Sequence, residues 1–161
     1  MTMTLIETIT VGSGGATSIE FTGIPDTGLD LLVKVSARVN ATDYGLACRF
    51  NGDTSNVTSR VLRGIGDSEG STTAATLNGV TAKSDATANT FGNSEIYVSN
   101  YTSSAAKSFS GDGVNENNAD DAAKIISANS WSGTAAITSL QLTNASGNFV
   151  EHSTASLYLI S

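Results

Sequence analysis

Residues 30–39 read DLLVKVSARV, and this stretch indicates the fold class. Apolar residues occupy every second position from Leu31 to Val39, and the positions between them are mostly polar, with Leu32 as the exception. A helix would instead repeat its apolar residues at spacings of three and four. The alternation therefore predicts a strand with one buried face and one wet face.

The same period of two recurs along the whole chain. Further strands are expected around residues 5–11, 19–21, 46–50, 61–65, 96–98, 136–142 and 149–160. Turn residues separate them, for example Gly12-Ser13-Gly14-Gly15 and the single proline, Pro25. No helical stretch lies between the strands, which disfavours a βαβ fold. We expect one all-β domain over residues 1–161, an antiparallel two-sheet β-sandwich of the jelly-roll kind with about eight to ten strands.

Two segments lack the alternation. Residues 66–90 are small and polar, so a long loop is predicted there, with room for a short hairpin around Asn78-Gly79. Residues 111–124 are acidic and predict a second loop, with at most one helical turn from Asn118 onward.

Composition excludes several classes of protein. Charged residues make up 14% of the chain and the net charge is −7, which argues against binding to nucleic acid or to an anionic membrane. Cys48 is the only cysteine, so neither an internal disulfide nor a cysteine-based zinc site is expected. The N-terminal residues lack the features of a signal peptide, and no apolar run reaches the length of a membrane span. We therefore expect synthesis in a cytoplasm.

Few residues suggest chemistry. His152 is the only histidine, and the adjacent Glu151 should point to the opposite face of a strand. Cys48 lies on the apolar side of its strand and is interpreted as a core residue. Calcium ligands could be nominated from Asp112, Asn115, Glu116, Asp120 and Asp121. Their spacing does not fit an EF-hand, and a solvated acidic loop is the favoured interpretation. We expect no catalytic, metal or cofactor site and no enzymatic activity.

Three residues are weak candidates for a contact surface. Tyr101 and Trp131 could stack on a sugar or anchor an interface, because large aromatic residues are enriched at interface centres. Core packing is the favoured interpretation for either aromatic residue alone. His152 is the third candidate, as a surface or interface histidine.

Several ordered phrases of the sequence resemble a known family. They are TLIETITVGSGGATSIEFTGIP (4–25), the strand at 30–39, EIYVSNYTSSAAKSFSGDGVNENNA (95–119) and WSGTAAITSLQLTNASGNFVEHSTASLYLIS (131–161). Together they resemble small β-rich virion proteins of tailed phages of aquatic bacteria, including cyanophages. The residues between about 40 and 94 match only loosely.

The resemblance implies a structural role without catalytic residues. The leading expectation is a capsid cement or decoration protein on the exterior of the virion, which spans junctions of the major capsid protein. It would associate with copies of itself, and a trimer would suit capsid three-fold sites. The alternative is a tail, fibre or receptor-binding module that recognises host-surface glycans.

Overall fold

The computed structural model describes residues 2–74, 76–117 and 122–161. This part of the chain contains no helix. Its strands, in chain order, are β1 Met3–Thr10, β2 Ser18–Thr22, β3 Asp30–Ala37, β4 Gly45–Phe50, β5 Val57–Ile65, β6 Ser68–Thr72, β7 Gly79–Val80, β8 Gly92–Val98, β9 Lys107–Asn115, β10 Ala123–Trp131, β11 Ser139–Asn144 and β12 Thr154–Ile160.

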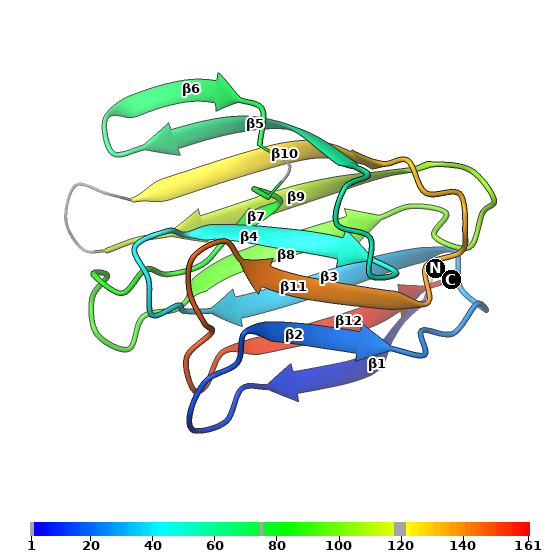
Figure 1. Cartoon of the computed structure of the whole chain (residues 1–161), viewed down its shortest axis with the longest axis horizontal. Coiled ribbons are helices and arrows are strands. Elements are labelled where there is room, and N and C mark those ends of the chain that lie inside the picture. Colours follow the sequence, from blue (N-terminus) through cyan, green and yellow to red (C-terminus); the bar gives the residue numbers. More distant parts are fainter. Residues whose placement is uncertain (1, 75, 118–121) are drawn as a thin grey trace.

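The strands form two antiparallel sheets of unequal size. The large sheet has eight strands in the order β1-β12-β3-β8-β9-β10-β5-β6, and the small sheet has four in the order β2-β11-β4-β7. The small sheet lies across one face of the large sheet, in front of it in Figure 1. The predicted all-β, two-sheet sandwich is therefore confirmed.

Strand β3 has the predicted alternation. Leu31, Val33 and Val35 are buried on the face toward the small sheet, whereas Lys34 and Ser36 are exposed on the other face. The strand pairs with β12 on one side and β8 on the other, so it lies inside the large sheet. This position explains why so many of its residues are buried.

An apolar core fills the space between the small sheet and strands β3, β8 and β12. Aromatic rings extend it toward β9 and β10. The Phe50 ring lies edge-on to that of Phe109, with centroids 5.1 Å apart, and 5.6 Å from the Trp131 ring. Such arrangements place the positive edge of one ring against the negative face of another.

Both predicted loops contain strands, so those predictions were wrong in part. Strands β6 and β7 lie within 66–90. Strand β9 runs to Asn115 and β10 begins at Ala123, so only the middle of 111–124 can be loop. The helical turn expected from Asn118 onward falls on residues 118–121, which lie outside the described residues.

Beside the apolar core, the chain around β7 packs directly on the large sheet. An added Cβ at Gly111 would lie 1.8 Å from the carbonyl oxygen of Asn78, and one at Gly113 would lie 2.9 Å from the Val80 nitrogen. Glycine is therefore required at both positions, because backbone of the β7 segment and the hydroxyls of Ser94 and Ser127 already occupy the space above them.

Polar side chains from the large sheet hold this segment in place. The Ser94 hydroxyl lies 2.8 Å from both the nitrogen and the carbonyl oxygen of Val80. The Asn78 amide donates to the Asn129 side-chain oxygen at 2.9 Å. The Asn115 amide donates to the Thr81 carbonyl at 2.7 Å. We define the polar layer as Asn78, Ser94, Asn115 and Asn129, together with Ser59, Gly111, Gly113 and Ser127.

Candidate functional site

The structure places the two aromatic candidates in the interior. Tyr101 is 0% exposed and Trp131 is 3% exposed, so neither is the surface contact that was considered for it. The Tyr101 hydroxyl donates to the Pro25 carbonyl, and burial is the main cause that raises its pKa. The Trp131 indole donates to Asp53 at 3.0 Å. Their burial agrees with core packing, which was the favoured interpretation.

His152 is exposed, but it does not lie within a strand as expected. It occupies the turn before β12 with a φ of 71°, and its nitrogen donates to the Val11 carbonyl at 3.0 Å. No metal site surrounds it, because among the described residues no three His, Cys, Asp or Glu side chains lie close enough to hold a metal ion.

Two interior groups could have been reactive and are structural instead. Cys48 is 1% exposed, as predicted for a core residue, and burial raises the pKa of its thiol. The Lys107 ammonium lies 5.3 Å from the Trp131 ring centroid and donates to the Ser103 carbonyl at 2.7 Å. Loss of solvation lowers the pKa of Lys107.

Two of the residues nominated for calcium lie on opposite faces of β9. Asp112 is exposed on the outer face of β9 and pairs with Lys124, whereas Asn115 is buried on the inner face. Asp120 and Asp121 lie outside the described residues.

No described helix is long and apolar enough to cross a membrane.

The surface feature that distinguishes the molecule is the uncovered face of the large sheet, opposite the small sheet. Directly opposed residues of antiparallel strands share a face. One row on this face runs across seven strands through Leu5, Tyr158, Leu32, Tyr97, Ser110, Ala128 and Arg60. The parallel row contains Ser156, Lys34, Glu95, Asp112, Ile126, Leu62 and Ser71.

Apolar side chains gather on this uncovered face. Among the described residues, the exposed large hydrophobic side chains are Met3, Leu5, Leu29, Leu62, Tyr97, Val114 and Ile126. By strand register, all of these except Leu29, which precedes β3, lie on the uncovered face. Contiguous exposed apolar patches on a protein surface often mark contact sites.

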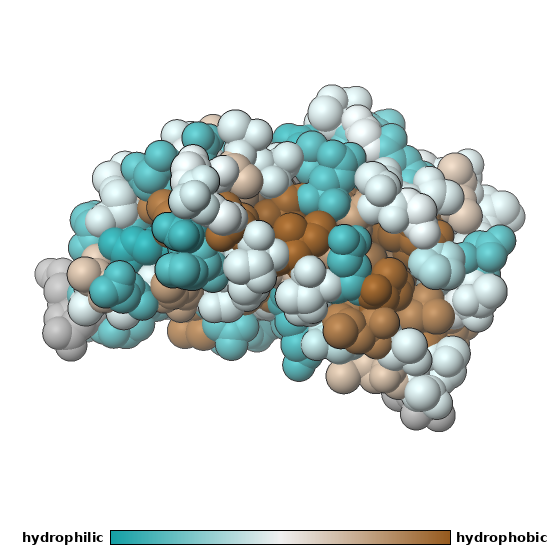
Figure 2. Space-filling view, turned by 90° about the horizontal axis from the view of Figure 1, so that it is seen from below, coloured by the Kyte–Doolittle hydropathy of each residue, from teal (hydrophilic) through white to brown (hydrophobic). Residues whose placement is uncertain are grey.

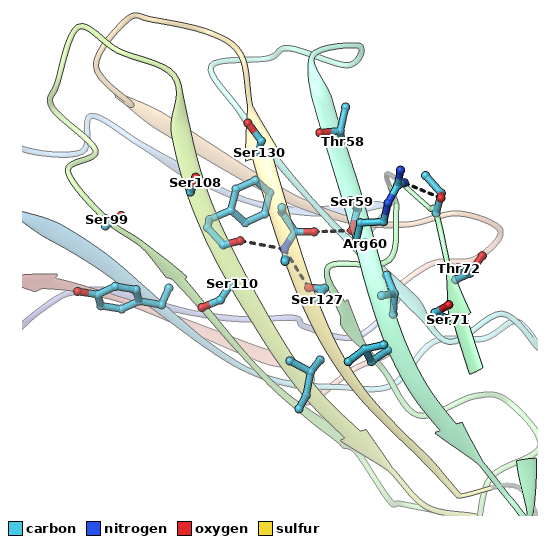
Figure 3. Close-up of a pocket in the computed structure, with 18 residues that line it drawn as sticks. Thr58, Ser59, Arg60, Ser71, Thr72, Ser99, Ser108, Ser110, Ser127 and Ser130 are labelled. Carbon is cyan, nitrogen blue, oxygen red and sulfur yellow. Dashed lines mark hydrogen bonds between the residues drawn. The ribbon is translucent and has the colours of Figure 1, made fainter. Parts of the chain in front are cut away.

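A shallow trough of about 1410 Å³ lies on the half of the face formed by β8, β9, β10, β5 and β6. Tyr97 lines one side and Arg60 the other, and the small residues Ser110 and Ala128 lie between them. Figure 3 shows Ser108, Ser110 and Ser130 beside this hollow and Arg60 directed toward the chain that follows β6. The Arg60 guanidinium donates to the Thr73 hydroxyl at 2.6 Å.

Charges on the uncovered face are nearly balanced. Lys34 and Glu95 lie 3.4 Å apart, and Lys124 pairs with Asp112. By register, the described charged residues of the face are the cations Lys34, Arg60 and Lys124 and the acids Asp30, Glu69, Glu95 and Asp112. Three cations against four acids leave −1, whereas the whole chain carries −7. The acidic surplus therefore lies elsewhere.

Apolar surface also reaches the edge of the sandwich. A view onto the side of β1 and β2 shows a broad apolar zone between polar regions (Figure 2). Strand β1 is the end strand of the large sheet, and its partner on the inner side is β12. Met3 and Leu5, each more than half exposed, connect this edge to the uncovered face.

The sequence prediction missed this surface. A usable signal was present, because Leu62 follows Val61 and Ile126 follows Ile125, which places apolar residues on both faces of β5 and β10.

Comparisons with family models, with curated proteins and with solved structures found no match for this chain.

Proposed function

We propose that this chain is a non-enzymatic structural protein of a phage virion, a capsid cement or decoration protein that attaches through the uncovered face of its large sheet. The observation that carries the proposal is an eight-stranded sheet with one face free and most of the exposed large apolar residues on that face. An enzyme of this fold would be expected to gather reactive groups in a cleft, whereas this face gathers contact residues.

The interior suits a protein that must keep its shape under load. Among the described residues, no buried side-chain nitrogen or oxygen lacks a hydrogen-bond partner. Satisfied polar contacts and ring packing together make a rigid body. On a capsid exterior, such a body would bridge neighbouring copies of the major capsid protein. The partners proposed are that protein and copies of the chain itself.

Stoichiometry tests this role directly. Purified particles that contain the protein should hold it in many copies, comparable to the number of shell subunits, as measured from a stained gel. Particles made without it should lose their DNA at a lower temperature than complete particles. A handful of copies per particle, or unchanged heat resistance, would contradict the proposal.

The trough supports a second candidate, recognition of host-surface glycans by a tail component. Hydroxyl side chains line it, Tyr97 borders it on β8, and Arg60 borders it on β5 with its guanidinium directed toward Thr73. Aromatic rings stack on sugars, and guanidinium groups bind carboxylates. NMR titration with 3′-sialyllactose, with lactose as the neutral control, should then shift resonances of β9 and β10. If neither sugar shifts resonances at about 10 mM, these glycans are excluded as ligands, because binding weaker than about 10 mM is too weak for recognition.

A further inference from the structure

We propose that a second copy of this chain docks on the uncovered face, so that two large sheets meet face to face around a twofold axis. The inference shares its surface with the proposed function but concerns the free protein, and it can fail separately. It rests on the size of the face, on its charge and on the difference between its two halves.

The face is large enough for a stable dimer. Eight strands spaced by about 4.8 Å span roughly 38 Å. Seven of them have seven to nine residues and run for roughly 25 Å, whereas β6 has five and is shorter. The resulting area, roughly 900 Å², exceeds the surface of about 800 Å² that each partner contributes to a standard interface. Stacked sheets with side chains between them are also a common packing arrangement.

Charge favours a second copy on this face over any other contact between copies. Two chains of net charge −7 repel each other wherever their acidic surplus meets. The uncovered face carries only −1, and two of its cations already lie beside carboxylates on neighbouring strands. Two copies can therefore approach here without the like-charge penalty that their other surfaces impose.

The two halves of the face complement each other. Met3 and Leu5 extend from the β1 half with exposed fractions of 53% and 52%. The other half holds the trough, whose lining includes Leu62 and Ile126. In a twofold dimer, each contact between two different surface patches occurs twice. The apolar side chains of β1 can thus enter the trough of the partner on both sides of the axis.

This geometry predicts a dimer rather than the trimer expected from the sequence. The test is the mass in solution, measured by light scattering after size exclusion over a range of protein concentrations. The wild-type chain should change from 16.4 kDa toward twice that mass as concentration rises. The double variant Leu62→Glu/Ile126→Glu should weaken association by roughly 100-fold, because it buries four carboxylates in one dimer.

Leu29→Glu is the matched control. Leu29 and Ile126 are each 55% exposed, but Leu29 lies off the face, so this variant should dimerise like the wild type. Circular dichroism confirms that each variant is folded. A folded wild type that stays monomeric at 1 mM, roughly the limit of weak association, overturns the pairing, as does a dimer insensitive to the double variant. The proposed role in a virion is tested separately, by the copy number of the protein per particle.

Discussion

The two buried regions of this sandwich are built in different ways. In the apolar core, side chains from both sheets fill the space, as with Leu142 from β11 and Leu31 from β3. In the polar layer, the backbone of residues 78–81 lies against Gly111 and Gly113, and asparagine and serine side chains bind that backbone. The first region depends on the volume of its side chains. The second depends on hydrogen bonds and on the absence of side chains.

This difference bears on function because the polar layer supports the half of the sheet that holds the trough. Strands β9 and β10 contribute residues to the polar layer on one face and to the trough on the other. The contact surface is therefore as rigid as the hydrogen bonds behind it. Variants that disturb one region and spare the other separate the two modes of packing.

The largest effect is expected from Gly111→Ala. The new Cβ would lie 1.8 Å from the Asn78 carbonyl oxygen and 2.5 Å from the Ser127 hydroxyl, so the chain around β7 must move away. We expect a loss of about 3 kcal/mol or more in the free energy of unfolding, measured by urea denaturation.

Gly64→Ala is the control for that substitution. Gly64 is also in a strand of the large sheet, and nothing lies within 4 Å of its added Cβ. Its stability should change by less than about 0.5 kcal/mol. Equal stabilities of the two variants would show that backbone does not pack closely on β9.

The next effect compares substitutions that keep the number of side-chain heavy atoms. Asn129→Leu removes the acceptor for the Asn78 amide and for the Ser59 hydroxyl, and leaves these buried donors unpaired. We expect a loss of about 2–3 kcal/mol. Leu142→Met in the apolar core should cost less than about 1.5 kcal/mol, because it replaces one apolar side chain with another of similar volume. Thermal unfolding of both variants measures the difference. A more stable Asn129→Leu protein would refute the role given to the polar layer.

A smaller effect is expected at the loop that follows β7. The Arg38 guanidinium donates to the carbonyl oxygens of Ser84, Ala86, Thr87 and Thr90 at 2.8–3.2 Å. Arg38→Met keeps the apolar stem of the side chain and removes these donors. We expect a loss of about 1–2 kcal/mol and faster amide exchange within 84–90. If exchange accelerates equally in β3 and β12, Arg38 stabilises the whole sandwich and not this loop.

The smallest effect concerns the rim of the apolar core. The Asp53 carboxylate accepts hydrogen bonds from the Ser55 backbone, the Asn56 side chain and the Trp131 indole, which lower its pKa. A lowered folded-state pKa stabilises the fold above the ordinary carboxyl pKa of roughly 4, and this contribution is lost as the pH falls.

The wild type should therefore be more stable than Asp53→Asn at pH 7, and the difference should shrink between roughly pH 4 and pH 2. Melting temperatures across this range measure it. A difference that stays constant with pH would mean that the charge of Asp53 makes no contribution.

The same contrast explains what could be predicted from the sequence. Strands of the apolar core, such as β3, β8 and β12, show a clear alternation because their inward residues are large and apolar. Strands β9 and β10 also alternate, but Gly111, Gly113, Ser127 and Asn129 occupy inward positions, so hydropathy did not reveal them. Their packing partner is distant backbone, which local sequence does not specify.

The candidate site was missed for a related reason. Tyr101 and Trp131 were chosen because large aromatic residues often make contacts, yet burial depends on the tertiary structure and both are interior. The uncovered face became apparent only when strand register placed Leu5, Leu62 and Ile126 on one side of one sheet. Residues so distant in sequence give no joint signal until the strands are ordered.

The uncovered face is the contact surface in both proposals. Hydroxyl-radical footprinting of the purified chain over a series of concentrations tests this role at single residues. Oxidation of Leu62 and Ile126 should fall as concentration rises, whereas that of Leu29, as exposed as Ile126 in one chain, should stay constant. Oxidation of Leu62 and Ile126 that stays as constant as that of Leu29 would contradict a contact role for this face.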